Sequence, residues 1–280
     1  LGLGTSSETV IGVGQPGVVA VDPTTNQAVL VPPEGEPQRF EVVEAPADNT
    51  LIAPDGAVWT LSEGGRFSRT TTLQQEVYAD GLGDAKLTLV GNLGMVYDGA
   101  TNRVRLGGGS WVTLPDDVEP SELVLQQPGP TANCGWLAQG DRLWCVATDG
   151  LTRDVTVEGL AAGRSDYLSI AGDAAVLVDR SSLEIRRFDW HDGRLLTEPR
   201  ASVDSAASLR VAASTDLVWV EDREGNSIWA ITPWGINPMR KDDETAPLLG
   251  DTGELIDDGS GGSGGVIDQG TDEQQEREPD

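Results

Sequence analysis

The sequence predicts an all-β domain built from about six similar units and followed by an acidic tail. One phrase, a β-rich strand followed by a tight turn and a second apolar strand, recurs six times along the chain. Apart from pieces of a turn or two, no segment has the apolar spacing of an amphipathic helix. Beyond Asp242 the apolar pattern stops, and Gly, Ser, Asp and Glu dominate. The repeat predicts the β units, and the change in composition predicts the tail.

The six phrases lie at a regular spacing. Their first strands begin near residues 9, 50, 86, 134, 166 and 209, a period of about 40 residues, which is typical of a four-stranded propeller blade. Radial repetition explains this spacing, because each blade buries its faces only against its neighbours, whereas a β-sandwich has no reason to repeat one phrase. We therefore predict a β-propeller of about six four-stranded blades over residues 9–242.

The remaining strands of each blade are visible in weaker form. Third strands follow a second turn, and three of these turns share an Asp-x-x-x-Asn pattern, at 22–26, 98–102 and 222–226. Asx side chains satisfy local backbone groups and tolerate left-handed backbone conformations. Fourth strands are predicted at 39–43, 75–78, 110–114, 155–157 and 194–197. The outer edge of the last blade, near Trp234, is left open.

Both ends of the chain are predicted to be disordered. Residues 1–8 precede the first strand, and residues 243–280 combine a Gly/Ser run at 259–265 with a carboxylate-rich end at 271–280. Low hydrophobicity and mutually repelling charges cannot offset the entropy that is lost on ordering. We expect residues 243–280 to form a flexible acidic linker.

The two cysteines, Cys134 and Cys145, are predicted to form a disulfide. A tight turn at 139–140 sets a hairpin register in which the two cysteines lie directly opposite each other, within bonding reach. The alternative is two unrelated buried thiols. A disulfide implies an oxidising compartment, and two thiols alone are too few for a structural zinc site.

The formal net charge of −27 excludes some partners. Nucleic acid is disfavoured because neutralising its phosphates requires clustered Lys and Arg, and anionic lipid is disfavoured for the same reason. Two interpretations of the charge stay open. It keeps a surface domain soluble, or it attracts a basic or cation-rich partner.

The residues offer little that is typical of catalysis. The single histidine, His191, lies in an Asp-Trp-His-Asp-Gly segment that predicts a hairpin turn, with a catalytic or metal-binding role as the alternative. The run 107–109 is a glycine loop without the Lys-Ser/Thr of a phosphate site. We therefore expect no enzyme and no catalytic residue. Four tryptophans at corresponding strand positions favour packing between blades over a sugar-stacking platform, namely Trp59, Trp144, Trp219 and Trp229.

One constellation suggests a cation site. The first turns of successive blades are predicted to carry oxygen-bearing side chains, and if these turns circle the axis their oxygens converge at one channel mouth, a chemistry suited to calcium. The alternative is that Asp, Asn and Gly are simply the residues that form turns. No other cofactor is expected. The side chains are those of Gln15, Asp55, Asn92, Asp141, Asp173 and Asp216, and the four aspartates are the candidate metal ligands.

Several segments resemble a known family. Residues 123–130 (LVLQQPGP), 217–220 (LVWV) and 226–230 (NSIWA) are similar to the N-terminal region of very large actinobacterial surface proteins. The resemblance covers roughly 9–242 and the acidic tail, while 234–238 (WGINP) departs from the family's pattern. It implies a membrane anchor upstream, a propeller-like ectodomain, an acidic linker and downstream fibronectin type III or Ig-like repeats. It implies no catalytic residues.

The sequence and this resemblance together predict an extracellular, non-enzymatic scaffold or interaction module of a bacterial cell-surface protein. Its partner is expected to be a protein or a cell-surface glycan, with no membrane contact by this segment itself. One alternative is a propeller that binds a glycan or a cation at a channel mouth. Another alternative is a propeller lactonase or lyase.

Overall fold

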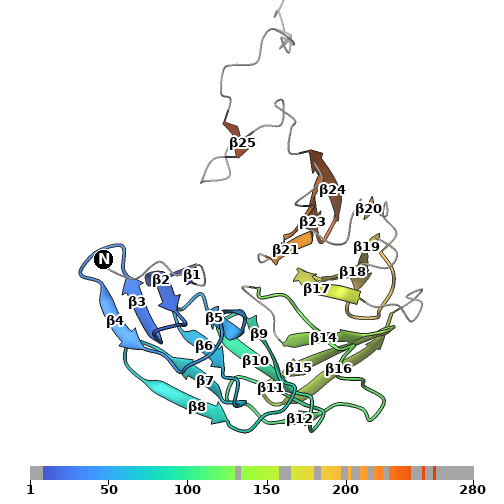
Figure 1. Cartoon of the computed structure of the whole chain (residues 1–280). Helices are drawn as coiled ribbons and strands as arrows, with labels where there is room; N and C mark the ends of the chain where they lie inside the picture. Colours follow the sequence, from blue (N-terminus) through green and yellow to red (C-terminus); the bar gives the residue numbers. More distant parts are fainter. Residues whose placement is uncertain are drawn as a thin grey trace, which may run out of the picture. The chain divides into compact units, whose positions relative to one another are not determined.

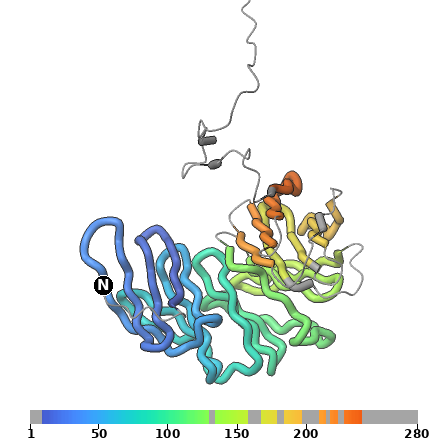
Figure 2. Tube along the Cα trace, turned by 45° about the horizontal axis from the view of Figure 1, so that its top comes forward, coloured from blue at the N-terminus to red at the C-terminus, as the bar shows by residue number. Residues whose placement is uncertain are grey.

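The computed structural model describes residues 9–129, 134–157, 165–179, 184–196, 201–202, 209–213, 217–222, 227–240, 248–249 and 255–256. These residues form six four-stranded antiparallel sheets, and the one helical segment among them is a 3-10 turn at Ala47–Asn49. Figure 1 shows these sheets following one another in chain order, and Figure 2 traces the same order along the backbone by its colours. The predicted all-β propeller of six four-stranded blades is confirmed. Within the described ranges, no helix is long and apolar enough to cross a membrane.

Each blade is a meander in which four consecutive strands pair in order. Blades 1 to 3 comprise β1 (Val10–Gly14), β2 (Gly17–Asp22), β3 (Gln27–Val31), β4 (Gln38–Glu41); β5 (Thr50–Ile52), β6 (Val58–Leu61), β7 (Phe67–Thr70), β8 (Gln75–Ala79); and β9 (Lys86–Val90), β10 (Leu93–Asp98), β11 (Arg103–Leu106), β12 (Val112–Thr113). Blades 4 to 6 comprise β13 (Val124–Leu125), β14 (Gly135–Gln139), β15 (Arg142–Ala147), β16 (Gly150–Thr156); β17 (Ser165–Ala171), β18 (Ala174–Asp179), β19 (Glu184–Asp189), β20 (Ala201–Ser202); and β21 (Leu209–Ala213), β22 (Val218–Asp222), β23 (Ser227–Thr232), β24 (Gly235–Arg240).

The meander sorts the turns onto two ends of each blade. Because the strands are antiparallel, the turns between strands one and two and between strands three and four lie at the same end. We call this end the first-turn face. The turns between strands two and three, and the links from one blade to the next, lie at the opposite end, which we call the second-turn face.

The core consists of apolar layers between neighbouring blades. Trp59 of β6 belongs to a cluster with Leu89 and Val96 of the next blade, and Trp144 of β15 packs with Met95 and other residues of blade 3. Both indoles are 1% exposed. Aromatic side chains bury the largest apolar areas, so these layers contribute most of the contact between blades.

Small residues let the inner strands approach closely. A Cβ atom at Gly12 of β1 would lie 2.6 Å from the side chain of Ile52 in β5. Farther along the chain, Gln126 of blade 4 joins its own blade to blade 3. Its side-chain amide donates to the Leu89 carbonyl (3.3 Å) and accepts from the Trp136 amide (2.9 Å), and its own carbonyl accepts from Thr88 (2.6 Å). These polar contacts satisfy buried groups at the inner edge of the sheets.

The Asp-x-x-x-Asn turns have the predicted backbone conformation. Asn26 and Asn102 have φ of 57° and 51°, which is the left-handed region that Asn tolerates. Asn226 lies outside the described residues. The aspartates that open the three turns, Asp22, Asp98 and Asp222, are all buried at the ends of second strands.

The fourth blade corrects the sequence-based assignment. Its first strand is β13, not the segment beginning at Cys134, and the cysteine hairpin β14–β15 forms the second and third strands. The first strands therefore begin at residues 10, 50, 86, 124, 165 and 209. The β13 strand was missed because it has only two residues and lies well before β14 in the sequence, whereas the cysteine hairpin has five directly paired positions.

The predicted disulfide is present, with a different register. Cys134 and Cys145 are bonded, and their Cα atoms lie 5.6 Å apart. The residue directly opposite Cys145 is Trp136, because the turn occupies 140–141 rather than 139–140. The bond therefore runs diagonally, and it lies in the apolar layer between blades 4 and 5.

The chain divides into two units, Leu1–Lys241 and Asp242–Asp280. In the second unit, the described residues form a two-stranded ribbon of β25 (Leu248–Leu249) and β26 (Leu255–Ile256). The other residues of the tail, and residues 1–8, lie outside the described residues, so their disorder stays a prediction.

Candidate functional site

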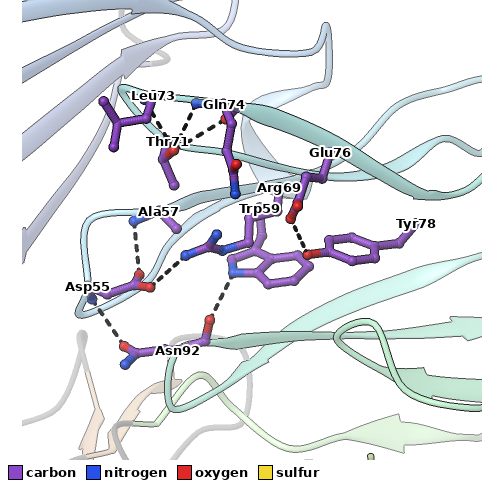
Figure 3. Close-up of polar contacts among 10 residues, drawn as sticks. All are labelled: Asp55, Ala57, Trp59, Arg69, Thr71, Leu73, Gln74, Glu76, Tyr78 and Asn92. Atoms are coloured by element: carbon purple, nitrogen blue, oxygen red, sulfur yellow. Dashed lines mark hydrogen bonds and ion pairs between the residues drawn. The ribbon is translucent and has the colours of Figure 1, made fainter.

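The first turns of blades 2 and 3 are joined by the side chains that the sequence singled out (Figure 3). The Asp55 amide donates to Asn92 Oδ1 (3.1 Å), and the Trp59 indole donates to the Asn92 carbonyl (3.1 Å). The Asp55 carboxylate accepts from the Ala57 amide (3.0 Å) and pairs with Arg69 (2.9 Å). Both carboxylate oxygens of Asp55 are therefore engaged within the protein.

The other predicted cation ligands do not lie on one face. Asp173 lies in the first turn of blade 5, but Asp141 lies in the second turn of blade 4, on the second-turn face. Asp216 lies outside the described residues. The expected ring of four carboxylates at one mouth is corrected for Asp141, because the cysteine hairpin is one strand farther out than predicted. No three His, Cys, Asp or Glu side chains in the described ranges are grouped to hold a metal ion.

His191 lies in the third turn of blade 5, as its sequence context predicts. Its backbone amide and its ring Nδ1 lie 2.9 and 3.0 Å from Asp189 Oδ1, and its ring stacks on Trp190 with centroids 3.7 Å apart. Burial alone would raise the pKa of Asp189, but the hydrogen bonds from His191 and the charges of His191 and Arg194 outweigh it and hold that pKa below its usual value. The Asp189 carboxylate therefore holds the His191 imidazole in one orientation.

A small apolar pocket lies where inner strands converge on the first-turn face. Its volume is about 270 Å³. Its lining consists of apolar or small residues and contains no ionisable side chain. Such a pocket suits an apolar group rather than a hard cation. The lining residues are Ile52, Pro54, Leu89, Gly91, Pro128, Gly129 and Ala213.

A larger groove lies between blades 1 and 2. Its volume is about 890 Å³, within the range of ligand sites in proteins. We call it the blade 1–2 groove. Four segments line it: 23–24 in the second turn of blade 1, 41–46 at the end of β4 and in the link between the blades, 62–64 with Arg66 in the second turn of blade 2, and 70–75 around the third turn of blade 2.

Local hydrogen bonds fix the walls of this groove. Thr71 Oγ1 accepts from the amides of Leu73 (3.3 Å) and Gln74 (3.1 Å), as Figure 3 shows, so this turn holds Leu73 with 93% of its surface exposed. Ser62 Oγ accepts from the Arg66 amide (3.0 Å) in the opposite wall. A site with such walls is largely formed before a ligand arrives.

The groove is acidic. Glu41, Glu44 and Glu63 line it with exposed side chains. Among the residues that the structure describes, none of the three makes a hydrogen bond or an ion pair through its side chain. The basic residue of the lining, Arg66, is already paired with Asp80 (3.1 Å). The carboxylates of the groove are therefore free to meet an outside charge.

Sequence reasoning did not identify the groove. Its four segments lie up to about 50 residues apart, and the contact between blade 1 and blade 2 brings them together. The one local signal is the Thr71–Gln74 turn, whose Thr and apolar Leu73 indicate an exposed turn but not its neighbours.

The comparisons with known proteins show the fold. No family model and no curated protein matches the chain. Virginiamycin B lyase from Staphylococcus aureus is similar in structure, with a TM-score of 0.55 and 16% identity over 84% of this chain and 85% of that one. A streptogramin B lyase has a TM-score of 0.54 and 18% identity over 88% of each chain. PorZ, an essential surface component of the type-IX secretion system of Porphyromonas gingivalis, has a TM-score of 0.50 and 11% identity over 82% of this chain and 32% of its own.

These comparisons correct one expectation. We expected a chain that is not an enzyme, but lyases stand among the propellers that this fold resembles. Enzymes are therefore built on this fold, and the expectation that the chain is not an enzyme is withdrawn. The comparisons give no support for a parent protein with fibronectin type III or Ig-like repeats.

Proposed function

We propose that this chain is an extracellular ligand-binding propeller that holds a protein or glycan partner in the blade 1–2 groove. The observation that carries the proposal is the groove itself, about 890 Å³ in volume, with fixed walls and three unpaired carboxylates. The Cys134–Cys145 disulfide supports a location in an oxidising compartment. The similarity in fold to the surface component PorZ agrees with this location.

The groove is a better candidate than the pocket on the first-turn face. The pocket has less than a third of its volume and offers no charged or hydroxyl-bearing side chain to orient a ligand. The groove offers both, together with the exposed side chain of Leu73. Specific sites combine apolar contact with a few polar groups in fixed positions.

A filled groove tests the proposal. Gly64 lies in the groove wall, and a Cβ atom there would meet only Ser62 Oγ, at 3.8 Å, so Gly64→Trp introduces a large side chain without backbone strain. The matched control, Ser121→Trp, adds the same side chain at an exposed position outside the groove. Ligands are first selected on arrays of cell-surface glycans and synthetic peptides, and their affinities are then measured by calorimetry. We expect Gly64→Trp to weaken every selected ligand by about tenfold or more, and the control to bind like the parent. Selected ligands that bind Gly64→Trp unchanged would exclude the groove.

A second candidate function is lyase activity, favoured by the Asp189–His191 pair. A carboxylate that orients an imidazole is an arrangement suited to a general base. His191 is the chain's single histidine. One of the similar structures is a catalytically inactive His-to-Ala variant of virginiamycin B lyase with quinupristin, so a histidine is essential in that protein.

Substrate loss tests this second candidate. The chain is incubated with virginiamycin B or quinupristin, and the remaining substrate is measured by chromatography. Lyase activity predicts consumption by the parent, its loss in His191→Ala, and a reduced rate in Asp189→Asn, which keeps the shape of the side chain but removes the charge. Equal consumption by the parent and His191→Ala would contradict a role for this imidazole.

A further inference from the structure

The blade 1–2 groove carries information on the chemistry of its occupant. This inference rests on the proposed function and names the class of partner that the groove takes. The groove presents three kinds of contact: unpaired carboxylates, hydroxyl groups and exposed apolar surface.

The charges of the groove are unbalanced. Glu41 ends β4, Glu44 lies on the link between the blades, and Glu63 lies on the second turn of blade 2, so the negative side chains come from both blades. The guanidinium of Arg66 is already held by Asp80 at 3.1 Å. With a net charge of −27 on the chain, the surrounding field also favours a cationic ligand.

The spread of the carboxylates favours several positive groups over one ion. The groove contains no group of three His, Cys, Asp or Glu side chains arranged to hold a metal ion. Lys and Arg side chains on an extended segment can each reach a separate carboxylate, because alternate residues of a strand point to the same side about 7 Å apart.

Apolar contacts distinguish a peptide from a simple polycation. Leu73 is 93% exposed on a turn that is fixed by hydrogen bonds to Thr71, and Val43 and Pro46 lie in the same lining. These side chains suit an aliphatic residue placed between basic ones. The lining contains no aromatic side chain, so it lacks the stacking surface that sugar rings use.

The outermost strands of blades 1 and 2 each contribute one end residue to the lining of the groove. Glu41 ends β4 and Gln75 begins β8, and these strands are the outermost of blades 1 and 2. An outermost strand presents N–H and C=O groups that no strand of its own sheet pairs.

We propose that the occupant of the blade 1–2 groove is an extended segment of a partner protein in which Lys or Arg residues flank an aliphatic residue. The chain's own tail does not fit this description. Residues 242–280 are dominated by Asp and Glu, with Arg277 as their single basic residue, so the carboxylates of the groove repel them.

Fluorescence anisotropy with labelled synthetic peptides tests the proposal. The probe is a short peptide in which lysine, valine and serine alternate, and its control carries glutamine at every lysine position. The groove variant is Glu41→Gln/Glu44→Gln/Glu63→Gln. The matched control variant, Glu34→Gln/Glu36→Gln/Asp116→Asn, removes three exposed charges outside the groove and so changes the net charge of the chain equally.

We expect the lysine peptide to bind the parent and the control variant with similar affinity. The groove variant should bind it about tenfold more weakly, since each of three partly exposed charge pairs contributes a fraction of a kcal/mol. Binding should weaken with salt, and the glutamine peptide should bind at the level of the groove variant.

The outcomes separate this inference from the proposed function. If Gly64→Trp weakens the ligands selected on the arrays but the two triple variants bind them alike, the groove is the site and the cationic partner is wrong. Equal loss of the lysine peptide in both triple variants would indicate non-specific attraction and overturn the inference. No binding of the lysine peptide to the parent would overturn it as well.

Discussion

At the residue scale, two threonine hydroxyls donate hydrogen bonds to the buried aspartates that open the second turns of blades 1 and 3. Thr24 Oγ1 donates to the buried carboxylate of Asp22 (2.6 Å), and the Thr24 amide donates to the same oxygen (3.0 Å). In blade 3, Thr101 Oγ1 donates to Asp98 in the same way. The hydrogen bond from the Thr24 hydroxyl is the main cause that holds the pKa of Asp22 below its usual value of 3.8, against the opposing effect of burial.

Thr24→Val should weaken this effect in a pH-dependent way. The variant keeps the backbone donor and removes the hydroxyl, so the pKa of Asp22 should rise toward 3.8. A depressed pKa stabilises the folded state above pH 3.8, and this contribution disappears as the pH falls through the folded-state pKa. The variant should therefore be less stable than the parent at neutral pH and equal to it below the folded-state pKa. Carboxyl NMR titration and urea unfolding at several pH values measure both effects, and a constant stability difference at all pH values would contradict the assignment.

Asp55 and Asp141 should differ in their effect on stability, although the sequence assigned them the same role. Asp55→Ala removes the ion pair with Arg69 and the acceptor for the Ala57 amide, which should cost about 1–2 kcal/mol. Asp141→Ala, at an exposed turn position, should stay within about 0.5 kcal/mol of the parent. Asp55→Ala should remain the less stable variant when thermal unfolding is measured with calcium or with a chelator, because the Asp55 carboxylate is already paired with Arg69. A calcium-dependent stabilisation that both variants lose would restore the cation site.

At the scale of elements, one strand of blade 3 is shaped to receive the tryptophan of blade 2. Trp59 of β6 stacks with Phe67 and Tyr78 at centroid distances of 5.2 and 5.4 Å. Gly94 of β10 leaves the room for this stack, since a Cβ atom there would lie 2.5 Å from the indole and 3.0 Å from the Phe67 ring. The two strands are therefore complementary in shape, and not merely apolar.

Gly94→Ala should destabilise the propeller. Inserting a methyl group into this packed layer forces Trp59 or β10 to move, at a cost of about 1–3 kcal/mol. Gly64→Ala is the matched control, because its Cβ would meet only Ser62 Oγ at 3.8 Å, and it should change stability by less than about 0.5 kcal/mol. Urea unfolding measures both. Equal stability of the two variants would contradict this prediction, because it would mean that the side chains between blades 2 and 3 can rearrange to accept the methyl group at little cost.

In the fourth blade the repeat was recognised, but its first strand, β13, was assigned to the wrong segment. The first strands of the other five blades begin within about one residue of their predicted positions, but the hairpin of Cys134 and Cys145 was predicted to be the first hairpin of blade 4, and the two-residue β13 was missed. The start of β13 at 124 gives a more even spacing than 134 does, so the period itself contained the signal. The hydrogen bonds of Gln126 with Trp136, which tie β13 to β14, are tertiary and leave no mark in the local pattern.

At the scale of the whole molecule, the tail should be independent of the propeller in stability. The chain divides between Lys241 and Asp242, and residues 243–280 are predicted to bury little apolar surface. Removing 243–280 should change the melting temperature by less than about 2 °C, as measured by calorimetry on both chains. A larger decrease would mean that the tail docks on the propeller.

The sequence by itself determined the repeat, and through it the architecture. Strand alternation, turn residues such as Asn26 and Asn102, and the spacing of the blades are local properties, set by backbone sterics and by the burial of every second side chain. The pairing of Cys134 with Cys145 was also within reach, since the two residues share one hairpin. The tertiary structure decided which turns share a face, because a strand of two residues shifts every later turn of its blade to the other end. It also decided the candidate site, because Glu41, Glu44 and Glu63 come together only where blade 1 packs against blade 2, and packing between distant segments depends on shape that no local pattern encodes.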